Sequence, residues 1–254
     1  LATKTASNGF VVAVINSNSI VDQPTSRATQ MAAALKQVAT MSTQSGSPLF
    51  GKVDLSRQAV MGHSMGGGTL EAARANPSLK AAVALTPWDA EVKDFSAIQV
   101  PTQIVACEKD TIAPNDKHSD VFFASLSNAI PKGYFNVAGA SHLCGITLEP
   151  IKYRTMVGKA SVAWLKRFVD QDTRYDAFLK GEAARNQTGA ASGRRLALDY
   201  YQQAVAQGVL LPGARMPSVR ELMQRHGVSL STALQALRTL EAQGSVQARP
   251  RVGY

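Results

Sequence analysis

A serine between glycines is the first feature of the sequence that could do chemistry. Residues 62–66 read Gly-His-Ser-Met-Gly, between a predicted strand at 57–61 and a predicted helix at 65–75. A G-x-S-x-G turn between strand and helix presents a nucleophilic serine at the carboxyl edge of a sheet. The sequence therefore predicts that Ser64 is a nucleophile. The alternative is a glycine-rich turn with an ordinary helix-capping serine.

A serine nucleophile needs a base, and two histidines follow Ser64 in the first part of the chain. His142 lies in a loop just past a predicted strand at 133–138, whereas His118 lies inside a predicted amphipathic helix at 116–126. The loop position after the last strand favours His142 as the base. The alternative for His142 is an ordinary surface histidine.

The base in turn needs an orienting carboxylate, expected between the serine and the histidine in chain order. Asp110 follows a predicted strand that ends at Cys107, and it precedes an irregular turn at 111–114. Such a turn can aim a carboxylate sideways at an imidazole. We expect the rival carboxylates to lie on solvated faces. They are Glu108, Asp116 and Asp120.

The elements that must position these residues alternate along the first part of the chain. The expected strands are 10–15, 57–61, 81–85, 103–107 and 134–137, and the expected helices are 24–41, 65–75, 116–126 and 152–170. The continuous apolar run at 10–15 predicts a strand that is buried on both faces. The alternation predicts an α/β fold with a mostly parallel sheet covered by helices on both faces.

Composition excludes several classes of protein. The chain has 254 residues, a formal net charge of +9 and only two cysteines. Two cysteines exclude a disulfide-dense scaffold and a multi-cysteine zinc module. No stretch of eighteen uncharged apolar residues occurs, so we expect no transmembrane helix and no membrane partner.

The charge divides the chain into two parts. Residues 1–182 carry 18 Lys and Arg against 15 Asp and Glu, a net of +3, whereas residues 183–254 carry nine Arg against three acidic residues, a net of +6. Residues 181–193 hold no large apolar side chain and are predicted to be a linker. The expected domains are therefore 1–180 and 194–254.

Motifs of the first domain resemble those of bacterial cutinase-like polyesterases, including the poly(ethylene terephthalate) hydrolases, over about residues 9–179. The motifs are Gly62–Gly68, Thr86–Asp89, Cys107–Pro114, Ser141–Cys144, Trp164–Phe168 and Asp172–Tyr175. The resemblance implies an α/β-hydrolase fold and a serine hydrolase of polyesters, cutin-like esters or short acyl esters. The implied reaction would need neither a metal nor an organic cofactor.

The resemblance also implies roles for individual residues. Ser64 would be the nucleophile, His142 the base and Asp110 its orienting acid, with the backbone N–H of Met65 as one oxyanion donor. Cys107 and Cys144 would form a disulfide between the acid loop and the base loop; the alternative is two free thiols.

The implied substrate-binding residues are His63, Trp88, His118 and Phe122. Trp88 would line the cleft and stack on the ester. His118 and Phe122, four residues apart, would pack behind Trp88 and limit its motion.

The sequence also departs from the family. Roughly a third of a domain precedes the position that matches residue 9 in the family, so we expect a partial sheet without its opening strands and without a second oxyanion donor. Lys180 stands where the family has a closing cysteine. The alternative to a hydrolase is therefore a chimeric or truncated chain without a competent site, whose only activity lies in its C-terminal part.

The second domain has the pattern of a winged helix-turn-helix. A helix is predicted at 194–207, and Ser218 and Glu221 form a capping box at the start of a second helix. A third helix, with Leu237 toward the core, is predicted to end at Gly244. A basic hairpin-like segment follows.

This domain resembles the GntR-type winged-helix domains. The motifs that carry the resemblance are Leu211–Gly213, Met216–Leu222, Val228–Ser229, Thr232, Leu240–Gly244 and Arg249–Tyr254. It implies that residues 194–254 bind DNA, and the net charge of +6 suits phosphate binding. The implied DNA contacts are Arg220, Ser231, Thr232, Arg238, Arg249 and Arg251. The alternative is a small helical appendage with solvated arginines.

The two resemblances imply different compartments. A disulfide-bonded hydrolase is expected to be secreted, whereas a DNA-binding module is expected in the cytoplasm.

Overall fold

The computed structural model describes residues 1–146, 149–179, 218–221, 237–238, 240–241, 244 and 246–247. The chain divides into two compact units, Leu1–Leu179 and Lys180–Tyr254. The predicted linker at 181–193 lies outside the described residues. Within the described part of the chain, no helix has the length and apolar character needed to cross a membrane.

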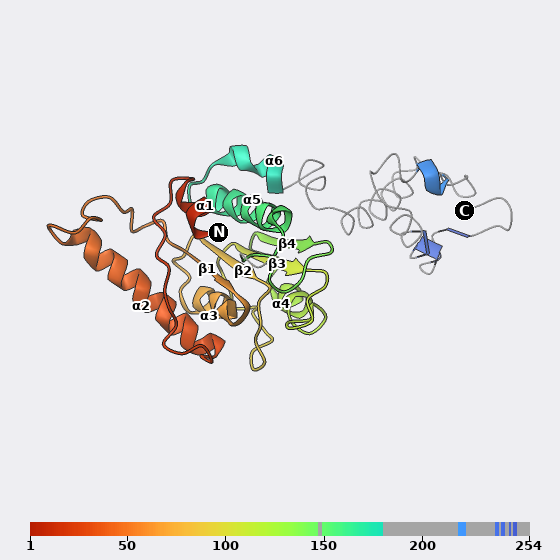
Figure 1. Ribbon diagram of the computed structural model, residues 1–254, viewed down its shortest axis with the longest axis horizontal. Helices are drawn as coiled ribbons and strands as arrows, with labels where there is room; N and C mark the ends of the chain where they lie inside the picture. Colours follow the sequence, from red (N-terminus) through yellow and green to blue (C-terminus); the bar gives the residue numbers. More distant parts are fainter. Residues whose placement is uncertain are drawn as a thin grey trace. The chain divides into compact units, whose positions relative to one another are not determined.

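The first unit is built around a parallel sheet (Figure 1). Its four strands lie in the order β1 (Ala59–His63), β2 (Ala81–Leu85), β3 (Thr102–Cys107) and β4 (Lys132–Val137). All three strand pairs are parallel, so the carboxyl ends of the strands meet at one edge. The two central strands are buried along their whole length, as their apolar runs predict.

Helices cover both faces of this sheet, and each face has its own apolar core. The helices are α1 (Ala2–Ala6), α2 (Pro24–Thr43), α3 (Gly68–Ala75), α4 (Ser119–Ser125), α5 (Ile151–Phe168) and α6 (Asp176–Leu179), with short 3₁₀ turns η1 (Ser64–Gly67) and η2 (Thr173–Tyr175). Helices α2, α3 and α4 pack on one face, and α5 packs on the other. The predicted α/β fold with a parallel sheet is confirmed.

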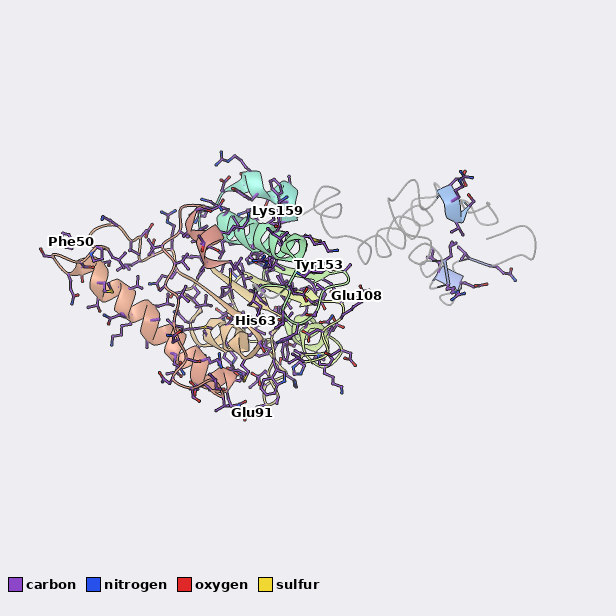
Figure 2. The ribbon with its side chains drawn as sticks, viewed as in Figure 1. Phe50, His63, Glu91, Glu108, Tyr153 and Lys159 are labelled. Carbon is purple, nitrogen blue, oxygen red and sulfur yellow. A yellow bond between two sulfur atoms is a disulfide. The ribbon has the colours of Figure 1, made fainter. Side chains whose placement is uncertain are left out.

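Most residues of α2 are at least partly exposed to solvent. Only Pro24, Ala28 and Ser42 are buried, while Met31 and Leu35 pack partly against the core. The side chain of Phe50, which follows the helix, projects at the outer end of this region (Figure 2).

One predicted strand is wrong. Residues 10–15 form no strand, and none of the described strands pairs with them. Phe10 packs partly on the core, but Val11 is 52% exposed and Val14 is 76% exposed. An apolar run is buried on both faces only when neighbouring strands pair with it and helices cover it, and this segment has neither.

Two predicted helices begin differently from expectation. The segment at 65–75 opens as η1 before α3 begins, and the helix predicted from 116 begins only at Ser119. The backbone of His118 is not helical, with φ −131° and ψ −87°. His118 therefore precedes α4 instead of lying inside it.

Helices α2 and α3 meet at a glycine that leaves no room for a side chain. A Cβ on Gly68 would lie 2.3 Å from the Pro24 carbonyl oxygen and 2.9 Å from the Ala28 nitrogen. Both atoms belong to the backbone of α2, so they cannot move aside without moving the helix.

We therefore expect Gly68→Ala to lower the free energy of unfolding by about 1–3 kcal/mol, because the added methyl group overpacks this contact. Gly66→Ala is the matched control, since no atom lies within 4 Å of its Cβ position. Urea unfolding of both variants measures the difference. Equal stability of the two variants would contradict the close packing at Gly68.

Candidate active site

Ser64 lies in a strained turn directly after β1. Its φ of +59° is uncommon for a residue other than glycine. A Cβ on Gly62 would lie 2.4 Å from the Gly66 carbonyl oxygen, and one on Gly67 would lie 2.6 Å from the Trp88 carbonyl oxygen. The Trp88 N–H donates to the Ser64 carbonyl oxygen at 2.9 Å. Glycine at 62 and 67 is thus what permits the turn to pack this closely.

The imidazole of His142 contacts Ser64 on one side and Asp110 on the other. Its Nε2 lies 2.8 Å from Ser64 Oγ, and its Nδ1 lies 2.7 Å from Asp110 Oδ2. An ionised carboxylate can only accept a hydrogen bond, so Nδ1 carries the proton. The lone pair of Nε2 is then free to accept the hydroxyl proton of Ser64, as a general base requires.

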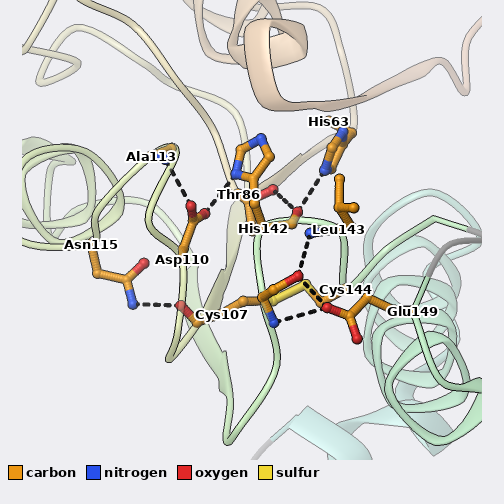
Figure 3. The surroundings of a disulfide bond; sticks show 11 residues. His63, Thr86, Cys107, Asp110, Ala113, Asn115, His142, Leu143, Cys144 and Glu149 are labelled. Carbon is orange, nitrogen blue, oxygen red and sulfur yellow. Dashed lines mark hydrogen bonds and ion pairs between the residues drawn. A yellow bond between two sulfur atoms is a disulfide. The ribbon is translucent and has the colours of Figure 1, made fainter.

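Asp110 is oriented by its own turn (Figure 3). Its Oδ1 accepts from the Ile112 N–H at 2.9 Å and from the Ala113 N–H at 2.7 Å. Both side chains of the pair are buried, with the carboxylate of Asp110 0% exposed and the imidazole of His142 5% exposed. The irregular turn after β3 therefore aims the carboxylate at the imidazole.

The three rival carboxylates, Glu108, Asp116 and Asp120, are exposed, as expected. Glu108 accepts from the Gly139 N–H at 2.8 Å, and Asp120 accepts from the Tyr134 hydroxyl. The structure thus brings Ser64, His142 and Asp110 together. Their catalytic roles stay a prediction.

Two further contacts hold the loop that carries His142. The expected disulfide joins Cys107, at the end of β3, to Cys144, across a sequence separation of 37. A disulfide that closes a loop of this length stabilises the folded state by about 3–4 kcal/mol, because it lowers the chain entropy of the unfolded state. Glu149 accepts from the N–H of Ser141 at 3.0 Å and from its hydroxyl. Sequence reasoning missed Glu149, because nothing in the local pattern links it to the base.

The aromatic residues expected to bind substrate form a stack. The ring centroids of Trp88 and His118 lie 5.9 Å apart with an angle of 29° between the ring planes, and His118 meets Phe122 edge-on at 5.7 Å. The Asp89 N–H donates to His118 Nδ1 at 3.3 Å. Phe122 is fully buried, so it supports the stack from behind and presents no surface to a ligand.

The remaining two predicted site residues flank the serine. Met65 follows Ser64 within η1, and its role as an oxyanion donor stays a prediction. His63 Nε2 lies 2.8 Å from the backbone carbonyl oxygen of His142, a contact that the sequence did not predict. Thr86 Oγ1 donates to the same oxygen at 3.2 Å.

Burial lowers the pKa of His63 and of His118. Desolvation is the largest cause for both histidines; the Lys93 charge lowers the pKa of His118 further, and the Asp110 charge raises it.

In the described residues, no three histidine, cysteine or carboxylate side chains are grouped so that they could hold a metal ion.

The described residues of the second unit are few. Ser218 and Glu221 form the predicted capping box, with reciprocal hydrogen bonds of 2.7 and 3.3 Å. Leu237 is buried as expected, while Arg220 and Arg238 are exposed. The other expected DNA contacts lie outside the described residues. They are Ser231, Thr232, Arg249 and Arg251.

Two families match the chain. Residues 1–196 match the family described as PET hydrolase-like, and residues 199–254 match the family described as bacterial regulatory proteins, gntR family.

Three relatives illustrate the similarity. Cutinase 2 of Thermobifida cellulosilytica is 48% identical over 180 residues, which cover 70% of this chain and 65% of that protein. Cutinase cut1 of Thermobifida fusca is 48% identical over 180 residues, 70% of this chain and 54% of that protein. The bis(hydroxyethyl) terephthalate hydrolase of Streptomyces coelicolor is 42% identical over 180 residues, again 70% and 54%. The chain thus spans between 54% and 65% of the length of these relatives.

The lowered pKa of His118 predicts a pH dependence of stability. In the unfolded chain, His118 binds a proton as the pH falls below its ordinary pKa of 6.5. In the folded chain, His118 binds this proton only at a lower pH. The contribution of His118 is therefore fully present above pH 6.5 and is lost as the pH falls through the window below it.

We expect His118→Asn to show a shallower loss of unfolding free energy than the original chain between about pH 7 and pH 5. Asn is chosen because its side-chain oxygen can accept from the Asp89 N–H without titrating. His63 contributes with the same sign in both proteins, so only the difference between them reports on His118. Parallel curves would rule out a lowered pKa at this residue.

Proposed function

Because the chain belongs to the PET hydrolase-like family, we propose that its first unit is a serine ester hydrolase of the α/β-hydrolase type. Its proposed substrates are polyesters, cutin-like esters and short acyl esters. The names of the cutinases point to cutin, and the names of the PET hydrolase-like family and of the bis(hydroxyethyl) terephthalate hydrolase point to terephthalate esters. The observation that carries the proposal is the continuous chain of contacts from Ser64 through His142 to Asp110.

The proposed reaction follows from the protonation states of these groups. His142 Nε2 takes the hydroxyl proton as Ser64 Oγ attacks the ester carbonyl carbon. Asp110 stabilises the imidazolium, which then gives the proton to the departing alcohol oxygen. The acyl group stays on Ser64 Oγ until water attacks it, with His142 again as the base.

The proposed oxyanion donor is the backbone N–H of Met65. Loss of one such donor typically lowers the rate by about 10²–10³, so the geometry of the turn after Ser64 contributes to the rate in addition to the triad. Trp88 is half-buried and is proposed to stack on the aromatic or acyl part of the ester. The ring of His118 lies against it from the protein side.

We expect Ser64→Ala to lower kcat for a short-chain p-nitrophenyl ester by about 10⁴-fold or more, because the nucleophile is lost. An active-site phosphonate should label the original chain once and the variant not at all. Mass spectrometry of the intact protein measures the labelling.

Ser127→Ala is the matched control, since the Ser127 hydroxyl accepts from the Ala129 N–H and takes no part in the proposed site. It should keep full turnover and labelling. Turnover that is equal in the original chain and in Ser64→Ala would overturn the proposed function.

The match over residues 199–254 favours a second activity, binding of duplex DNA. Arg220 and Arg238 are exposed, and the arginine excess of residues 183–254 suits phosphate contacts. The two activities belong to different compartments, because the Cys107–Cys144 disulfide suits an oxidising environment outside the cytoplasm. The competing hypothesis is a chain whose hydrolase site is not competent and whose activity is DNA binding alone.

We expect the full chain to bind mixed-sequence duplex DNA with an affinity that falls steeply with salt. Arg220→Ala should weaken binding and reduce the slope of log K against log salt by about 1, as expected for one lost phosphate contact. Fluorescence anisotropy measures both quantities. Arg174→Ala in the first unit removes the same charge and should change neither; no salt-dependent binding would refute this activity.

A further inference from the structure

The backbone of the proposed base is held by two side chains, one from the last residue of β1 and one from the residue that follows β2. The carbonyl oxygen of His142 lies 2.8 Å from His63 Nε2 and 3.2 Å from Thr86 Oγ1 (Figure 3). A carbonyl oxygen has two lone pairs, so these two contacts use its full accepting capacity. The main chain of His142 is thereby fixed at the residue whose side chain must stay between Ser64 and Asp110.

The contact assigns the proton on His63. A carbonyl oxygen cannot donate, so Nε2 of His63 must carry the proton. Burial lowers the pKa of His63, which favours the neutral ring with a single N–H. The rings of His63 and His142 lie 4.9 Å apart, and the His63 N–H reaches the main chain of His142. This N–H therefore donates to the main chain of the protein itself.

The two donors come from neighbouring strand ends. His63 is the last residue of β1 and pairs in register with Leu85, the last residue of β2. Thr86 follows Leu85 directly, so the parallel register sets the two donors side by side. His63 is also the residue directly before Ser64 in the chain. One residue therefore adjoins the proposed nucleophile and holds the main chain of the proposed base.

Thr86 adopts a conformation that β-branched residues avoid. Its φ is +39°, its side chain is buried, and its N–H donates to the Val105 carbonyl oxygen at 2.6 Å. Such outliers persist only where the surrounding structure imposes them, and they concentrate at functional sites. In this conformation the hydroxyl of Thr86 meets the His142 carbonyl.

We propose that His63 and Thr86 are positioning residues that clamp the main chain of His142, so that His63 acts through the base and not as a substrate contact. The proposal rests on the proposed hydrolase function. The sequence-based expectation for His63 is a contact with substrate, and this proposal differs from it. Thr86 belongs to the motif Thr86–Asp89, which by itself did not suggest a positioning role.

Two pairs of variants test the clamp. His63→Leu and Thr86→Val each remove one donor with little change in bulk, while His63→Gln and Thr86→Ser keep a donor near the same place. Displacing a catalytic group by a fraction of an ångström to 1 Å costs up to about 10²-fold in rate. We expect kcat to fall by about 5- to 50-fold in His63→Leu and Thr86→Val.

The split between kcat and KM separates positioning from substrate binding. Because His142 acts as base in both half-reactions, the fall in kcat should be the same for p-nitrophenyl acetate and for a bulkier aromatic ester, with KM unchanged. His63→Gln and Thr86→Ser should recover most of the loss. A rise in KM that grows with substrate size, an unchanged kcat, or donor-keeping variants as poor as the others would overturn the clamp.

A measurement without turnover tests the clamp even if the original chain proves no more active than Ser64→Ala. In ¹⁵N-histidine-labelled full chain, NMR should report the proton of His63 on Nε2 and that of His142 on Nδ1. The His142 Nδ1–H signal, which reports the bond to Asp110, should shift or broaden in His63→Leu and be retained in His63→Gln. A proton on Nδ1 of His63, or an unchanged His142 signal in His63→Leu, would overturn the proposal.

Discussion

A histidine ring can bond a hydroxyl and a carboxylate at the same time only when both partners lie in its plane, on opposite sides. In this chain the three groups follow three different strands: Ser64 follows β1, Asp110 follows β3 and His142 follows β4. The parallel register brings these strand ends to one edge of the sheet. The sheet therefore sets where the groups meet, and the loops need only supply the final orientation.

That final orientation depends on unfavourable backbone conformations held by good hydrogen bonds. Ser64 and Thr86 both have positive φ, which costs free energy for residues other than glycine. The Ser64 carbonyl accepts from the Trp88 N–H, and the Thr86 N–H donates to the Val105 carbonyl. Both strained residues thus directly follow strands of the parallel sheet, Ser64 after β1 and Thr86 after the buried strand β2, where the sheet leaves the backbone little freedom to relax.

The sequence predicted the four strands of the sheet and the three side chains that meet at its edge because both leave local signals: buried runs, a glycine-flanked serine, and loop positions after strands. It failed where burial depends on a partner elsewhere in the chain. The run at 10–15 has the composition of a buried strand, but the structure gives it no neighbour to pair with. Thr86 and Glu149 were missed because a hydroxyl or carboxylate that bonds a distant loop leaves no periodicity or spacing in its own segment.

The loop that carries His142 has several independent anchors, and only one of them depends on the redox state of the surroundings. The disulfide from Cys107 would be absent in a reducing cytoplasm, whereas the hydrogen bonds from His63 and Thr86 would remain. These bonds reach the His142 residue itself, while the disulfide acts two residues away. The compartment in which the chain works should therefore affect the stability of this loop more than the direction in which the imidazole points.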